Sequence, residues 1–151
     1  MRFAILAAVL FTASGILFVP RAGLQDDEIV FASPLYRTWE PAYSVRIAGR
    51  QLPLMILSYA GTLKTALYWP VLHFARPTKL SARLPMVLVG ALTVLIFYAW
   101  AQRIAGTAAA LAAAFLLATD PIFLLTDTFD WGPVAIEHLL VVSGCWLITR
   151  G

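Results

Sequence analysis

Two short acidic segments of this chain carry the side chains that could act in acid–base chemistry. The first is Gln25-Asp26-Asp27-Glu28, and the second holds Asp120, Asp127 and Asp130. A positioned carboxylate can accept the proton of a hydroxyl or an amine as that group attacks an electrophile. Three consecutive acids also repel one another unless a cation or a base pairs with them. The residue types alone leave two interpretations open: one shared site, or solvated loop charges.

Glu137 and His138 form a further ionisable pair, a few residues after Pro133. Ionisable residues inside a membrane span mark functional positions, but Glu137 is only about 6 Å along a helix axis from Pro133. We therefore expect a solvated, interfacial position for this pair. His73 and His138 could bind a metal together with the acids, but no usual ligand spacing supports such a site. We expect no cofactor; a divalent metal ion stays open as an alternative that no ligand pattern supports.

The composition indicates a membrane protein. Apolar residues make up 61% of the 151 positions and charged residues 13%, whereas a soluble domain has nearly half apolar and a quarter charged residues. The apolar residues also fall in blocks, which is typical of membrane spans. The net charge of +3 is too small and too scattered for nucleic-acid binding. The single cysteine, Cys145, excludes a disulfide within the chain.

The apolar blocks predict an all-α membrane protein with about four transmembrane helices. We expect spans at residues 3–19, 85–103, 105–119 and 133–149. A cleaved signal peptide is the alternative for the first span, but Arg21 stands where a cleavage site needs a small residue. Residues 20–84 would form a large first external loop with juxtamembrane helices within Leu52–Phe74, and residues 120–132 a second external loop. Pro85 would occupy the first turn of its helix.

The basic residues at the expected helix ends suggest an orientation. Arg2, Arg103 and Arg150 would share one face that carries no acid. The positive-inside rule places that face in the cytoplasm and both acidic segments outside it. The first external loop carries more arginines in absolute number, but at about sixty residues it is at the limit where charge counting governs topology.

Four short elements follow one another along residues 3–150. They are Asp27-Glu28-Ile29-Val30-Phe31-Ala32; Leu52-Pro53-Leu54 with Tyr59 and Tyr68; Ser81-Ala82-Arg83-Leu84-Pro85 with Tyr98 and Arg103; and Ala118-Thr119-Asp120-Pro121 with Phe129-Asp130. In order and spacing they resemble elements of the GT-C membrane glycosyltransferases of the protein mannosyltransferase and aminoarabinose transferase type. The counterparts are the Asp-Glu-x-x-Tyr-Ala element, the Pro-Pro-Leu region, the Ala-Arg-Leu-Pro helix entry and the second external loop. Members run to several hundred residues, so the resemblance implies an N-terminal piece of such a transmembrane domain.

The resemblance implies transfer of a sugar from a polyprenyl-phosphate carrier to a lipid, glycan or protein acceptor outside the cytoplasm of a bacterium. Its catalytic residues would be Asp27, as the general base, with Glu28 beside it and Asp130 in support. Asp26 makes the assignment of the base ambiguous by one residue, and it would itself bind substrate. Basic residues must hold the donor phosphate: Arg83 matches the family's position, and Lys64, Arg50 and Arg46 are candidates by location.

The chain departs from the family pattern before the Pro-Pro-Leu region. Gln51 or Leu52 replaces a lysine found there, and the first proline is missing. Two other functions remain open alongside the glycosyltransferase: a small membrane scaffold, in which the acids are only solvated, and part of a transporter, in which Glu137 and His138 line the pathway.

Overall fold

The structure is a computed structural model that describes residues 2–32, 40–47, 49–58, 60–76, 78–129 and 131–150. Tyr59 and Asp130 lie outside the described residues, as do the side chains of Arg50 and His73.

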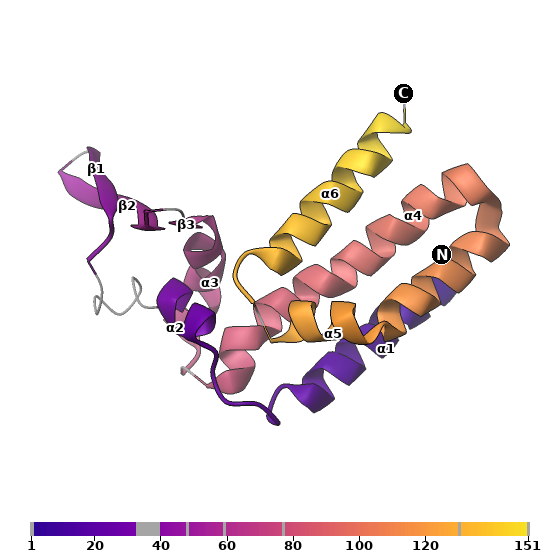
Figure 1. The fold of residues 1–151 in the computed structure, drawn as a ribbon, viewed down its shortest axis with the longest axis horizontal. Helices are drawn as coiled ribbons and strands as arrows, with labels where there is room; N and C mark the ends of the chain where they lie inside the picture. The colour runs from indigo at the N-terminus through magenta and orange to yellow at the C-terminus, as the bar shows by residue number, and fades with distance from the viewer. Residues whose placement is uncertain are drawn as a thin grey trace.

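A bundle of apolar helices forms the larger part of the molecule. α1 (Arg2–Phe18) packs along α4 (Lys79–Thr119), and α6 (Val134–Ile148) packs along another part of α4. α4 is not one straight rod. Gly106 has φ 80° and ψ 171°, which are not helical angles, and the chain reverses direction there, as Figure 1 shows. The positive φ suits glycine because it has no Cβ to clash.

The contact between α1 and α4 depends on small residues. Ala4, Ala7, Ala8, Phe11 and Gly15 are buried and recur at the spacing of one helix face. Phe11 fills a notch on α4, where a Cβ added to Gly90 would lie 2.6 Å from Phe11 Cζ. The face of α1 turned away from α4 exposes large apolar side chains, including Phe3 and Leu17.

α4 begins six residues before the position expected from the sequence. Thr78 is its N-cap: the Thr78 hydroxyl accepts from Ser81 N at 3.1 Å, and Thr78 N donates to Ser81 Oγ at 2.8 Å. This reciprocal pair satisfies two backbone donors that the first helical turn would otherwise leave unpaired. Pro85 therefore lies inside α4 rather than in its first turn.

A smaller unit lies beside the N-terminal end of α4. It consists of α2 (Asp26–Ala32), the strands β1 (Tyr43–Ile47), β2 (Arg50–Leu57) and β3 (Ala60–Gly61), and α3 (Leu63–Phe74). The strands form one antiparallel sheet in the order β1-β2-β3, with Ile47 paired to Arg50 and Leu57 to Ala60. Figure 1 shows the sheet at the end of the molecule away from the α4 turn. The Thr65 hydroxyl donates to Phe31 O at 2.8 Å and joins α3 to α2.

The chain between α4 and α6 is mostly helical. α5 (Pro121–Thr128) follows α4 directly and packs against α4, α1 and α6. Asp120 caps it, since Asp120 Oδ1 accepts from Phe123 N at 2.8 Å, and Pro121 occupies its first turn.

The expectation of an all-α protein with four membrane-spanning helices is wrong. Residues 43–61 contain a sheet, although juxtamembrane helices were expected from Leu52 onward. Residues 121–128 form a helix, although they lie in the expected second external loop. Among the described residues, only α4 is long and apolar enough to cross a membrane; α1 and α6 are apolar but shorter. The period of an apolar run predicts a helix, but the length of that helix decides whether it spans a bilayer.

Candidate active site

Asp27 and Glu28 are neighbours in the chain, but the structure separates their environments. Both belong to the first turn of α2, where successive side chains diverge by about 100° around the axis. Asp27 is exposed, whereas Glu28 is 3% exposed. One carboxylate is therefore open to a ligand and the other is part of the interior.

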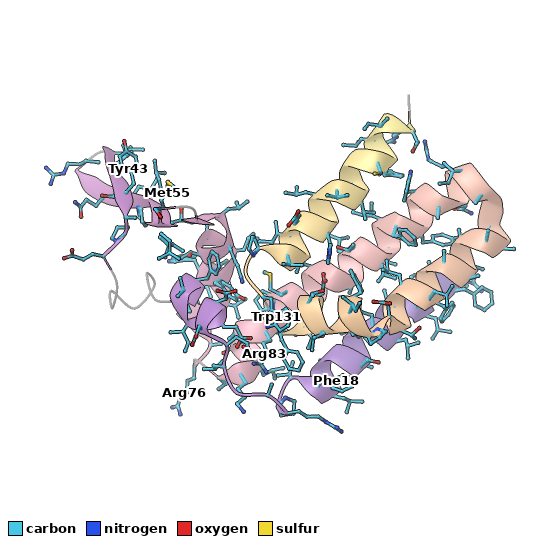
Figure 2. The ribbon with its side chains drawn as sticks, in the orientation of Figure 1. Phe18, Tyr43, Met55, Arg76, Arg83 and Trp131 are labelled. Carbon is cyan, nitrogen blue, oxygen red and sulfur yellow. The ribbon has the colours of Figure 1, made fainter. Side chains whose placement is uncertain are left out.

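The buried Glu28 forms an ion pair with Arg83 of α4. Arg83 Nε lies 2.5 Å from Glu28 Oε1, and Nη2 lies 3.0 Å from Oε2, so the pair is bidentate. Arg83 also donates to the carbonyl oxygens of Val19 and Gly23, at 2.5 Å each. Glu28 Oε2 accepts in turn from Gln25 N at 2.7 Å. The guanidinium thus joins three segments to α4: the end of α1, the connection that follows it, and α2. Figure 2 labels Arg83 at the N-terminal end of α4.

Lys64 of α3 is the second buried cation, at 2% exposed. Its Nζ donates to Gly132 O at 2.5 Å and lies 4.3 Å from the centre of the Phe31 ring, a cation–π contact. Gly132 has φ 57°, and a Cβ added to it would lie 3.6 Å from Asp27 Oδ2. Asp27 and Lys64 therefore both reach Gly132, from α2 and α3, just before α6 begins.

Two cavities meet at Asp27. One has a volume of about 520 Å³ and is lined by Asp27, Lys64 and Glu137 among apolar residues of α2, α3 and α6. The other, about 500 Å³ and more open, is lined by Asp26, Asp27 and Trp131. A carboxylate and an ammonium at one mostly apolar cavity can accept a proton and hold an anion within the same ligand.

The remaining residues expected at the site are distributed as follows. Asp26 lines the more open cavity only, and Arg83 lines neither of the two. Arg46 is exposed on β1 and is paired there with Gln51. The side chain of Arg50, the first residue of β2, and the whole of Asp130 lie outside the described residues. Asp120 caps α5 and lines neither cavity.

Glu137 and His138 lie on different sides of α6. Glu137 lines the 520 Å³ cavity, whereas His138 Nδ1 lies 2.8 Å from Asp127 Oδ2 and its ring lines a separate cavity of about 330 Å³. Asp127 is fully buried, and burial raises the pKa of its carboxyl above the ordinary 3.8. Across the described parts of the chain, no three His, Cys, Asp or Glu residues come together as a metal site.

The sequence interpretation did not identify Gly132 as part of the site. Its contribution is a backbone carbonyl and the lack of a side chain beside Asp27. Glycine next to proline in Trp131-Gly132-Pro133 was a signal of a turn, and glycine adopts the positive φ found here more readily than other residues.

Comparison with known proteins identifies the family. The family model described as dolichyl-phosphate-mannose-protein mannosyltransferase matches residues 63–151, more than half of the chain. No curated protein and no solved structure matches the chain. Proteins of that family are membrane-embedded GT-C glycosyltransferases with a polyprenyl-phosphate sugar donor, and the match confirms the resemblance to this family over residues 63–151. The chain belongs to the dolichyl-phosphate-mannose-protein mannosyltransferase family.

Proposed function

We propose that this chain carries the acceptor-activating part of a glycosyltransferase that moves a sugar from a polyprenyl phosphate to an acceptor hydroxyl or amine, with Asp27 as the general base. The observation that carries this proposal is the arrangement of Asp27 and Lys64 on the two sides of Gly132, at the edge of one 520 Å³ cavity.

The reaction assigns one role to each of these two groups. As the acceptor oxygen or nitrogen forms its bond to the anomeric carbon, Asp27 takes the acceptor proton. The bond between the anomeric carbon and the phosphate oxygen breaks, and its electron pair leaves with the polyprenyl phosphate. The Lys64 ammonium stabilises the negative charge of that leaving phosphate. We propose Arg50 as a second phosphate ligand and Asp130, two positions before Gly132, as a supporting acid.

The buried pair has a different role in this proposal. Glu28 and Arg83 saturate each other inside the protein, so we assign them to positioning α2 rather than to contact with substrate. Asp27 is then held at the cavity by its neighbour in the sequence. Asp26 lines the adjoining open cavity and would contact the incoming acceptor.

We further propose that the protein is a multi-pass protein of a bacterial plasma membrane with its acidic residues 26–28 on the non-cytoplasmic face. The membrane location is supported by the membrane-embedded family and by α4, the one helix in the described part of the chain that is long and apolar enough to cross a membrane.

Replacing Asp27 by Asn in the intact membrane-bound protein tests the base assignment. Asn keeps the shape of the side chain but cannot accept the proton, so transfer of labelled mannose from polyprenyl-phosphate mannose should fall by about 100-fold or more. Asp27→Glu should recover part of the rate. Glu40→Gln removes another exposed carboxylate of the same region and should leave the rate unchanged. Normal transfer by a stably folded Asp27→Asn protein would refute Asp27 as the base.

A further inference from the structure

The 330 Å³ cavity among α4, α5 and α6 is separate from the candidate active site. Its walls are apolar, with Phe97, Leu117, Ile122, Phe123 and Val142 among them. Its polar groups are the Asp120 carboxylate, the His138 imidazole and the hydroxyls of Thr93 and Thr126.

Each of these polar groups is set up to accept a hydrogen bond. The Thr93 hydroxyl donates to Val89 O at 3.0 Å. The Thr126 hydroxyl has acceptors in Ile122 O at 3.0 Å, Asp127 Oδ2 at 3.1 Å and Phe123 O at 3.3 Å. Each hydroxyl proton therefore has an acceptor inside the protein, which leaves the oxygen lone pairs of both residues for a ligand. Asp120 uses Oδ1 for the cap of α5 and remains a carboxylate acceptor.

The Asp127–His138 pair makes the imidazole an acceptor as well. With the proton on Nδ1, His138 donates to Asp127 Oδ2 across 2.8 Å, and Nε2 keeps its lone pair. The carboxylate of Asp127 is completely buried, so this bond holds the ring in place, while 39% of the His138 side chain stays accessible. Asp127 Oδ1 has no hydrogen-bond partner among the described residues, and Oδ2 also accepts from the Thr126 hydroxyl at 3.1 Å.

A ligand that matches this cavity must supply several N–H donors, a positive charge and an apolar body. A primary ammonium has three donors and complements Asp120. No lysine or arginine lines the cavity, so a headgroup without an ammonium has no side chain of opposite charge there. We propose that this cavity binds a membrane lipid whose headgroup is a primary ammonium, with its alkyl chain against the apolar wall. This site is independent of the glycosyl transfer assigned to Asp27.

Lipid binding to the intact protein in detergent, followed by native mass spectrometry, tests the proposal. Phosphatidylethanolamine should bind about tenfold more tightly than phosphatidylcholine of the same chain length, because the trimethylated headgroup keeps the charge but has no N–H donor. Equal binding of the two lipids would overturn the proposal. Free ethanolamine should not displace phosphatidylethanolamine at equal concentration, and displacement would show that the ligand is a soluble amine instead.

Two variants separate the site from the fold. Asp120→Asn keeps an oxygen that can cap α5 but removes the charge, and it should abolish the preference for phosphatidylethanolamine. His138→Asn keeps an N–H that can reach Asp127 and removes the acceptor in the cavity, so it should weaken binding. Glu137→Gln is the matched control, because Glu137 precedes His138 and faces the other cavity. A preference that survives Asp120→Asn, or that is lost equally in Glu137→Gln, would contradict the assignment.

Discussion

Breaking the pair between Glu28 and Arg83 should destabilise the protein more than any exposed substitution near the site. The side chains of Glu28 and Arg83 are 1% and 0% exposed, and Arg83 donates to both Glu28 oxygens and to three backbone carbonyls. Arg83→Met leaves the Glu28 carboxylate buried without a cation. Loss of one partner of a buried pair costs about 3–5 kcal/mol of unfolding free energy.

The size of the effect should depend on what each substitution leaves behind. Glu28→Gln keeps the shape and leaves Arg83 with its three carbonyl acceptors, so we expect a cost at the lower end of that range, about 3 kcal/mol. Arg83→Lys keeps the charge but loses the planar fork and should fall between these two. In the double variant Glu28→Leu with Arg83→Met, no buried charge remains, so its cost should be less than the summed costs of Glu28→Leu and Arg83→Met made singly.

Equilibrium unfolding in detergent measures these free energies, and limited trypsin digestion reports the local effect. Arg21 is exposed in the connection whose carbonyls Arg83 binds. Cleavage after Arg21 should therefore be faster in Arg83→Met than in wild type. Single substitutions that each cost under about 1 kcal/mol, or a double variant whose cost equals their sum, would refute the reasoning.

Three further predictions concern other contacts. Gly90→Ala should lower the unfolding free energy by about 1–2 kcal/mol, because the clash with Phe11 outweighs the gain in helix propensity. The control in the same unfolding assay is Gly23→Ala, whose added Cβ has nothing within 4 Å. Lys64→Gln should raise the KM for the polyprenyl-phosphate donor more than Lys64→Arg does in the transfer assay. Equal KM values for both variants and wild type would contradict a phosphate contact. The raised pKa of Asp127 means that folding favours its protonated form. Its contribution to stability is therefore greatest at a pH below 3.8, the ordinary pKa, and it decreases as the pH rises through the pKa of the folded state. Asp127→Asn should remove that part of the pH dependence in unfolding measurements, and an unchanged pH profile would argue against it.

The apolar runs predicted where helices lie, but not how the chain between them folds. α1 and α6 each begin and end within one residue of the expected 3–19 and 133–149. The sheet was missed because its apolar residues 52–57 were read as a juxtamembrane helix. Gly49 has φ 78° and lies between Ile47 and Arg50, which are paired across a tight hairpin. A glycine between two extended segments is a sequence signal of such a hairpin. The start of α4 was also readable from Thr78 and Ser81, the two residues of its cap.

The sequence distinguished Asp27 from Glu28 only through the family resemblance, because the different environments of the two side chains come from long-range contacts. Glu28 is removed from the solvent by Arg83, 55 positions away, and Asp27 is placed near Gly132. These contacts also give a physical reason for two of the sequence elements that resemble the family: the acidic pair and the Arg-Leu-Pro helix entry are bound to each other in one buried ion pair. Loss of activity in an Arg83 variant would therefore not by itself identify Arg83 as a phosphate ligand. Only a change in donor KM without a change in unfolding free energy would do so, and the burial of Arg83 argues that the two will change together.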